Sequence, residues 1–417
     1  MDLSPGRSRL GLAAVLALAV VSRLAVMATV AGGSLEDPDN YLPLARSLAD
    51  GRGFCFKGRP TAYRPPLYPL VLAPLVRAFG PEPTRAILGL HLALGLGTVA
   101  LTFATARRWG LSPGIGLVAA AIVACDPVLI VQGREVMTET LAAFLLTATL
   151  AALAGPPNQG AVLGGLGFGF SGLCRPSTLP ASALTALVLM VRGPGSWRTR
   201  LGRALMLVVM TALPLAPWAW RNAVLFGEAV WTTTHGGYTL ALANNPVYYD
   251  EVLHGPPGAV WSGANQQAWW QANNLANGGL TEPKADRALR ADALRTITAR
   301  PRDFVDASLA RLGRFWALAP SGAVYPWKVR LAVAVWTMPF WLALGFGLLR
   351  ADFWRWPKVT APAVVIALSI VHAVFWTDMR MRAPIVPALA LIAAGAMSSR
   401  GRSPDPKMVS RNNLEEK

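Results

Sequence analysis

Residues 10–31 read LGLAAVLALAVVSRLAVMATVA, an apolar run in which Arg23 is the single charged residue. A hydrocarbon core about 30 Å thick needs roughly 20 helical residues to cross it, so this run is long enough to span a bilayer. A signal peptide is the alternative, because Arg7 and Arg9 precede the run, but its apolar region has only about 7–15 residues. The run therefore predicts a retained first membrane span.

Similar runs recur along the chain and predict an all-α polytopic membrane protein with about ten transmembrane helices. Of the 417 residues, 53% are hydrophobic and only 15% are charged, with a mean hydropathy of +0.40. In soluble globular proteins about a quarter of the residues are charged, so the low charged fraction of this chain argues against that class. The predicted spans are residues 10–31, 84–106, 112–131, 136–154, 161–174, 178–191, 204–220, 331–349, 359–377 and 383–398.

The two spans predicted within residues 161–191 are short, and one long tilted helix is the alternative there.

The net charge is +17, but no nucleic-acid motif is present, so we expect no nucleic-acid partner. The basic residues instead follow the positive-inside rule and favour contact with anionic lipids. They cluster between spans at residues 7–9, 107–108, 192–203, 350–358 and 400–402.

An even number of spans places both termini on the same side of the membrane. Because the basic loops mark the inside, that side is the cytoplasm, and the membrane is a bacterial-type inner or plasma membrane. Residues 1–398 then form a single transmembrane domain, and the polar residues 399–417 predict a disordered cytoplasmic tail. Two long segments, residues 32–83 and 221–330, lie on the opposite, non-cytoplasmic side.

Short helices and turns are predicted within both exterior segments. In the first, Tyr41 to Ala49 predict a helix that lies on the membrane surface, and Leu67 to Phe79 predict a second interfacial or re-entrant piece. In the second, Gly236-Gly237 and the run Asn244-Asn245-Pro246 predict turns, and a membrane-hugging helix is expected from Pro301.

The densest cluster of charged and aromatic residues lies in the first exterior segment. It reads Glu36-Asp37-Pro38-Asp39-Asn40-Tyr41, and Arg64 and Tyr68 follow. A carboxylate on a turn beside the bilayer can act as a general base toward a hydroxyl or an amine. The structural alternative is that the acidic loop caps the helix at Tyr41, with Asp39 as its N-cap residue.

Arginines near the exterior face suit a phosphate, because a guanidinium offers paired donors and keeps its charge in a low dielectric. We expect Arg64, Arg221, Arg380 and Arg382 near that face, and Arg23 would complete a positive rim. Anchoring at the interface or pairing with an acid is the alternative for each. Further charges at the edges of spans are Asp126, Arg134, Glu135, Glu139 and Arg175.

The three cysteines and four histidines are widely separated and show no spacing suited to a metal. The sequence therefore indicates no metal site and no identified cofactor. A divalent cation, if one takes part, would have to be held mainly by carboxylates.

Several short patches resemble, in the same order, the superfamily of dolichyl-phosphate-mannose-protein mannosyltransferases and aminoarabinose transferases (glycosyltransferase family 39-like). Its members share the membrane-embedded GT-C fold. The patches are DPDNYLPLA (37–45), LADGRGF (48–54), PTAYRPPLYP (60–69), VMTETL (136–141), GLCRP (172–176), PWAWRN (217–222) and RMRAP (380–384).

The resemblance implies a membrane glycosyltransferase of the cell envelope that moves a hexose or pentose from a polyprenyl-phosphate donor. The acceptor would be a lipid, a glycan or a protein on the non-cytoplasmic face, and the configuration at the anomeric carbon would be inverted. Some members carry a large exterior C-terminal domain that is missing here, so acceptor recognition is expected from residues 221–330.

Carried over to this chain, Asp37 matches the aspartate of the family's first exterior loop, four residues before Tyr41. Many members have an acidic pair here, whereas this chain has Asp37-Pro38 and then Asp39, so either aspartate is a candidate base. The resemblance implies that Arg64, Arg221, Arg380, Arg382 and Arg23 bind the donor phosphate and that Glu139, Tyr41 and Tyr68 support the site.

A membrane transporter or lipid flippase is the rival class, in which charges within spans would line a pathway. Transporters often contain paired repeats with interrupted helices in corresponding halves. We find no such pairing in the sequence, which favours the enzyme.

Overall fold

The computed structural model describes residues 3–30, 35–256, 261, 264–322 and 324–398. The tail predicted at residues 399–417 lies outside the described residues. Helices dominate the described chain, which confirms the all-α class. The sequence did not predict the short antiparallel hairpin of β1 (Cys55–Phe56) and β2 (Arg59–Pro60) in the first exterior segment.

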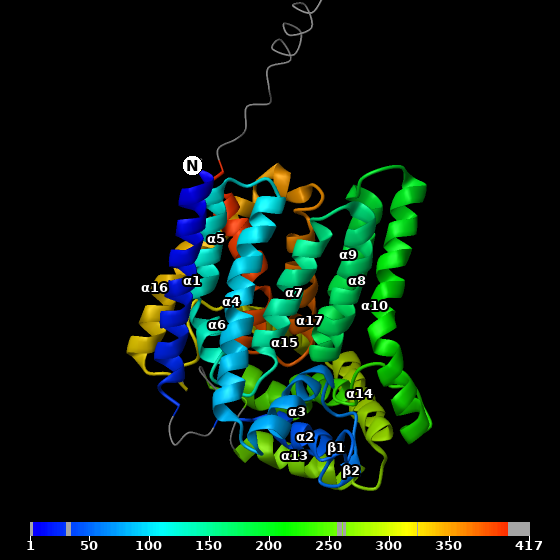
Figure 1. The fold of residues 1–417 in the computed structure, drawn as a ribbon. Coiled ribbons are helices and arrows are strands. Elements are labelled where there is room, and N and C mark those ends of the chain that lie inside the picture. Colours follow the sequence, from blue (N-terminus) through cyan, green and yellow to red (C-terminus); the bar gives the residue numbers. More distant parts are fainter. Residues whose placement is uncertain (1–2, 31–34, 257–260, 262–263, 323, 399–417) are drawn as a thin grey trace, which may run out of the picture.

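Each predicted span falls on a helix of one bundle (Figure 1). Within the described residues, four helices are long and apolar enough to cross a membrane by themselves, namely α1, α4, α10 and α16, so the total number of spans stays a prediction. The helices of the bundle are α1 (Pro5–Met27), α4 (Thr84–Arg108), α5 (Pro113–Cys125), α6 (Pro127–Gln132), α7 (Glu139–Leu153), α8 (Pro157–Cys174), α9 (Leu179–Arg192), α10 (Trp197–Phe226), α16 (Trp327–Leu348), α17 (Thr360–Val374) and α18 (Val386–Gly395).

Prolines mark two breaks between helices of the bundle, one within a predicted span and one between two predicted spans. The span at 112–131 divides into α5 and α6, because Asp126 takes an extended backbone before Pro127 and its side chain caps α6 by accepting from the Leu129 amide at 3.0 Å. At residues 161–191 the chain leaves the helix at Arg175 (φ −145°, ψ 105°) and makes a 3-10 turn, η2 (Pro176–Thr178). The turn separates α8 from α9, so the alternative of one long helix is excluded.

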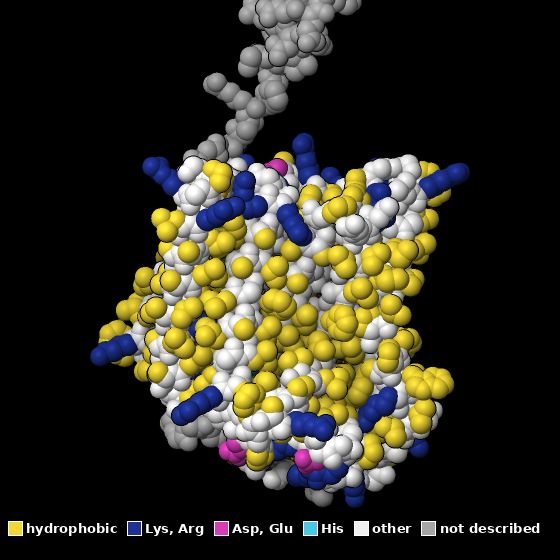
Figure 2. All heavy atoms as spheres, in the orientation of Figure 1, with side chains coloured by type: hydrophobic (Ala, Val, Ile, Leu, Met, Phe, Trp, Pro, Cys, Tyr) yellow, Lys and Arg dark blue, Asp and Glu magenta, His cyan; other side chains and the backbone are white. Residues whose placement is uncertain are grey.

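The two ends of the bundle differ in chemistry. Short turns join the helices at the end where α1 begins, and Ser4, Ser112 and Ser196 there cap α1, α5 and α10. The described ends of α1 and α18 lie together at this end (Figure 1). Figure 2 shows lysines and arginines gathered at both ends of the visible face, with hydrophobic side chains over the middle. That belt is the surface expected of a protein embedded in a bilayer.

The opposite end carries a layer of shorter elements. The helices predicted over Tyr41–Ala49 and Leu67–Phe79 and from Pro301 are present there. The elements of the layer are α2 (Tyr41–Ala49), α3 (Leu67–Phe79), α11 (Gly236–Ala243), α12 (Pro246–Tyr248), η3 (Tyr249–Leu253), α13 (Ala264–Asn277), α14 (Glu282–Ala299) and α15 (Pro301–Phe315); η4 (Ala351–Trp354) and η5 (Met379–Ile385) connect helices of the bundle.

The turn predicted at Gly236-Gly237 is wrong, because α11 begins there. Gly237 serves close packing instead, because a Cβ atom there would lie 1.9 Å from the Asp286 carbonyl oxygen of α14. The Gly237 amide also donates to the Asp286 carboxylate at 2.5 Å. Composition alone does not separate a turn glycine from one that lets two helices approach.

Glycines also set the contact between α8 and α10. A Cβ atom on Gly165 would lie 2.5 Å from the Leu207 carbonyl oxygen, and one on Gly169 would lie 2.5 Å from that of Thr211. The spacing of four residues places both glycines on one face of α8, the pattern by which helices approach closely in membranes. Beside this contact, the Ser182 and Thr211 hydroxyls hydrogen-bond at 2.8 Å and join α9 to α10.

We predict that Gly169→Leu lowers the unfolding temperature of the purified protein in detergent. The added side chain meets backbone, which cannot rotate away, and overpacking of this kind costs about 1–3 kcal/mol or more. Gly202→Leu on α10 is the matched control, because nothing lies within 4 Å of its added Cβ atom. Equal unfolding temperatures for the two variants would contradict the close packing of α8 on α10.

Candidate active site

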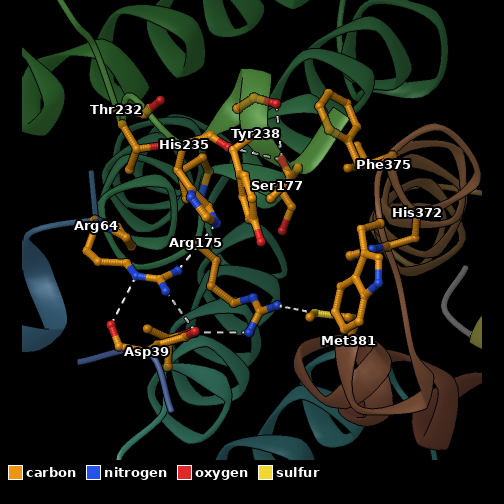
Figure 3. Close-up of a pocket in the computed structure, with 18 of the residues that line it drawn as sticks. Asp39, Arg64, Arg175, Ser177, Thr232, His235, Tyr238, His372, Phe375 and Met381 are labelled. Atoms are coloured by element: carbon orange, nitrogen blue, oxygen red, sulfur yellow. Dashed lines mark hydrogen bonds and ion pairs between the residues drawn. The ribbon is translucent and has the colours of Figure 1, made fainter. Parts of the chain in front are cut away.

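A cavity of about 600 Å³ lies where the bundle meets the layer of shorter helices (Figure 3). Its walls come from segments far apart in the sequence, among them the first exterior segment, the start of α7, η2, α11, α14, α17 and η5. Charged and polar residues from these segments face it, among them Asp39, Arg64, Glu139, Arg175, His235, Tyr238, Arg290, His372 and Arg380.

The two candidate aspartates have different surroundings. Both carboxylate oxygens of Asp37 accept backbone hydrogen bonds, from Tyr41 at 2.9 Å and from Leu42 at 2.8 Å. Asp37 therefore caps α2, and the suggestion that Asp39 caps this helix is wrong. Burial raises the pKa of the Asp37 carboxyl, although the hydrogen bonds from Leu42 and Tyr41 act against that rise. Asp39 lines the cavity and Asp37 does not.

The backbone brings the Asp39 loop to the start of α7. Glu36 and Glu135 form a parallel bridge, and the Val136 amide donates to the Glu36 carbonyl at 2.9 Å. Residues 37–39 and 137–139 consequently lie beside each other, although about a hundred residues separate them in the sequence. This bridge is why Asp39 and Glu139 face one cavity.

Arg64 fixes the position of the Asp39 loop. Its Nη2 atom pairs with Asp39 Oδ1 at 2.9 Å, and its Nε atom donates to the Asp39 carbonyl at 3.0 Å. Its Nη1 atom lies 3.3 Å from His235 Nε2 (Figure 3). Burial and the neighbouring Arg64 charge lower the pKa of His235 well below its ordinary value, so the ring is neutral at neutral pH and can accept from Arg64.

A second charged group lies across the cavity. Glu139 is fully buried, and its Oε1 atom is 2.8 Å from Arg175 Nη1 and 4.0 Å from Arg380 Nε. The Arg175 contact is close but does not have hydrogen-bond geometry. Arg175 also donates to the Thr138 hydroxyl at 3.1 Å, and Arg380 pairs with Asp378 at 3.2 Å. Two guanidinium groups thus share one buried carboxylate, which leaves donors for an anion.

Three arginines predicted for the phosphate have other partners. Arg23 donates to the carbonyls that end α5, the nearest at 2.9 Å. Arg221 donates to two carbonyls of the first exterior segment at 2.8 and 2.9 Å, and Arg382 donates to the Ala317 carbonyl at 2.6 Å. None of the three lines the cavity. Their guanidinium groups hold helix ends and loops together.

The two predicted supporting tyrosines form one aromatic pair. Tyr41 lines the cavity, and Tyr68 packs behind it edge to face, with 5.3 Å between the ring centroids. The Tyr68 hydroxyl lies 2.8 Å from His91 Nε2, and the other His91 ring nitrogen lies 2.9 Å from the Gly133 carbonyl oxygen. The pair therefore supports the cavity wall from the bundle side.

Several cavity residues were not assigned from the sequence. Arg175 was noted as a membrane-edge charge, but only its contact with Glu139 indicates a role. Tyr238 and Arg290 come from the second exterior segment, where no motif distinguished them from the surrounding polar residues. The described residues include no group of three or more histidine, cysteine, aspartate or glutamate side chains arranged to hold a metal.

An all-α membrane bundle with a charged cavity beneath a layer of shorter helices is thus the class of protein that the fold and the site define. Residues 77–155 match the family "Dolichyl-phosphate-mannose-protein mannosyltransferase". This segment runs from the end of α3 to the end of α7 and includes Glu139. A comparison with curated proteins finds no significant match.

Among solved structures, the chain is similar to the apo oligosaccharyltransferase of Archaeoglobus fulgidus, with 15% identity and a TM-score of 0.56 over 98% of this chain and 52% of that one. The archaeal oligosaccharyltransferase AglB of the same organism, in complex with an inhibitory peptide and a dolichol-phosphate, gives 14% identity and a TM-score of 0.50 over 96% and 54%. ArnT of Cupriavidus metallidurans gives 15% identity and a TM-score of 0.40 over 94% and 77%.

The chain spans about half the length of the oligosaccharyltransferase structures it matches. At these identities the similarity shows the fold. The family match and the shared fold agree with the resemblance seen in the sequence and support the GT-C superfamily. The chain is accordingly an integral membrane protein.

Proposed function

We propose that the chain is a glycosyltransferase that moves a sugar from a polyprenyl-phosphate donor to an acceptor at the cavity. The observation that carries the proposal is that the Asp39 carboxylate and the Arg175–Glu139–Arg380 group face the same cavity. The match to a mannosyltransferase family supports it, as does the fold shared with a protein whose structure contains dolichol-phosphate.

In this mechanism Asp39 is the general base. Its carboxylate takes the proton from an acceptor hydroxyl or amine as the oxygen or nitrogen of that group bonds to the anomeric carbon. The bond between the anomeric carbon and the phosphate oxygen breaks, and its electron pair leaves with polyprenyl phosphate. The configuration at the anomeric carbon is inverted. A phosphate leaving group needs no proton, so no general acid is required.

The donor phosphate lies between Arg175 and Arg380 in the proposed complex. Both guanidinium groups face the cavity, and a planar guanidinium suits a phosphate because it presents paired donors. Arg64 orients Asp39, to which it is already paired. This assignment keeps Arg380 and Arg64 from the sequence prediction, adds Arg175, and gives Arg23, Arg221 and Arg382 structural roles.

The acceptor enters from the layer of exterior helices. Tyr238 on α11 and Arg290 on α14 line that side of the cavity. This side corresponds to the second exterior segment, from which acceptor recognition is expected. The proposed orientation places this layer outside the cell and the arginine-rich turns at the other end in the cytoplasm, in accordance with the positive-inside rule.

A transfer assay distinguishes the enzyme from the rival transporter. Membranes that contain the protein are supplied with polyprenyl phosphates carrying labelled sugars, and we expect label on a non-donor acceptor together with free polyprenyl phosphate. Membranes without the protein are the control. Movement of intact donor across the bilayer without any transfer, for every hexose and pentose donor tried, would instead favour the flippase.

A further inference from the structure

One buried side chain of the cavity has no role in the mechanism above. His372 projects from the last turn of α17, lines the cavity and is only 3% exposed (Figure 3). Neither of its ring nitrogens makes a hydrogen bond. The Trp376 backbone approaches the ring but does not have hydrogen-bond geometry. Buried polar atoms are almost always paired, so this histidine needs an explanation.

Packing accounts for the ring but not for its nitrogens. His372 stacks on Phe315 with 5.0 Å between the centroids and 17° between the planes, and an apolar ring would stack there equally well. His91 in α4 lies in a similar setting. That ring is also buried, but each of its nitrogens lies within 3 Å of a polar partner. The polar atoms of His91 are therefore satisfied internally, whereas those of His372 are not.

The position of His372 relates it to the transferred sugar. It lines the same cavity as Arg175, one of the two proposed phosphate ligands. The end of α17 contacts α11 directly, because the Trp376 amide donates to the Thr239 carbonyl at 3.3 Å and Asn244 donates to the Val374 carbonyl at 2.9 Å. A sugar attached to a phosphate at Arg175 would lie in the cavity that these two helices line.

We infer that His372 binds a hydroxyl group of the donor sugar and thereby contributes to the choice of sugar. A neutral imidazole has one donor and one acceptor nitrogen, and a hydroxyl both donates and accepts. A phosphate only accepts, so it would leave the second nitrogen unpaired. The inference rests on the proposed function, since it assigns a sugar contact within the proposed site.

The test measures kcat/KM for the active polyprenyl-phosphate sugar and for its monodeoxy analogues. In the wild type we expect one deoxy analogue to lose about 10- to 100-fold, because its missing hydroxyl leaves a buried polar group unpaired. In His372→Phe, which keeps the stacking ring, kcat/KM for the parent donor should fall to the value for that analogue. The losses caused by removing the other sugar hydroxyls should remain as in the wild type. His372→Gln, which restores a hydrogen-bond donor and an acceptor, should recover part of kcat/KM for the parent donor.

Three other outcomes would overturn the inference. Equal loss for every donor, together with a lower unfolding temperature, would mean a structural role. Unchanged discrimination with weaker inhibition by free polyprenyl phosphate would place the phosphate at His372. Wild-type levels throughout would mean no role. A wild type that transfers no sugar at all would instead refute the proposed function, and this inference with it. His254→Phe, at a half-exposed ring paired with Asp303, is the control.

Discussion

Replacing Asp39 with asparagine is expected to lower kcat for sugar transfer by about 100- to 10,000-fold, the usual contribution of a general base. Asparagine keeps an oxygen that can accept from Arg64, so the loop should keep its position while losing the group that takes the proton. Donor KM should change little, because the proposed phosphate ligands lie elsewhere. Initial rates in detergent or proteoliposomes measure both quantities.

Asp37→Asn is the matched comparison, since the two aspartates are two residues apart and only one faces the cavity. Asparagine keeps one of the two capping interactions at the start of α2, so we expect a modest loss of stability, within the roughly 0.5–2 kcal/mol of helix caps. Transfer should persist. The reverse pattern, with Asp39→Asn active and Asp37→Asn inactive, would assign the base to Asp37.

Replacing Arg175 with alanine is expected to have the largest effect on the protein as a whole. Glu139 is fully buried and would lose its 2.8 Å partner, and breaking a buried ion pair by removing one member costs about 3–5 kcal/mol. The same change removes a proposed phosphate ligand. We therefore expect a lower unfolding temperature and a higher donor KM, measured on the purified protein.

A second variant separates these two effects. Glu139→Gln combined with Arg175→Met removes both buried charges and should recover most of the stability. It should not recover donor binding, because the phosphate still lacks one guanidinium group. Recovery of full transfer by the double variant would show that Arg175 acts only by pairing with Glu139.

Much of the fold follows from the sequence because a bilayer imposes a minimum length on apolar helices. The predicted spans correspond to helices for this reason, whereas the helices predicted at Tyr41–Ala49 and Leu67–Phe79 follow from their apolar residues. Prediction was less accurate where local geometry depends on a neighbour. The break at Asp126-Pro127 and the start of α11 at Gly236 depend on a capping side chain and on the approach of α14, which composition does not reveal.

The candidate site was predictable in kind but not in detail. The sequence singled out acidic and arginine residues as candidates, and four of them, Asp39, Arg64, Glu139 and Arg380, line one cavity. Their roles stay predictions. An arginine near a helix end, however, is equally well satisfied by backbone carbonyls as by a phosphate. Sequence alone could therefore not separate Arg380 from Arg382, which is two residues away and donates to the Ala317 carbonyl.

The same limit applies to the two aspartates. A capping carboxylate and a cavity carboxylate require the same residue type, and the choice depends on the direction of the backbone at Pro38 and Asn40. Asn40 has a left-handed backbone (φ 59°, ψ 40°), which turns the chain into α2 and lets the Asp37 side chain reach the helix amides. Such a turn is readily adopted by asparagine but is not dictated by it.

The most direct measurement is a density map of the Asp39→Asn protein with a bound polyprenyl-phosphate sugar, since this variant should bind the donor but transfer its sugar only slowly. Density for the phosphate between Arg175 and Arg380, with the anomeric carbon directed toward residue 39, is the predicted result. A phosphate bound elsewhere on the protein, or a donor whose sugar lies outside the cavity, would contradict the proposed site.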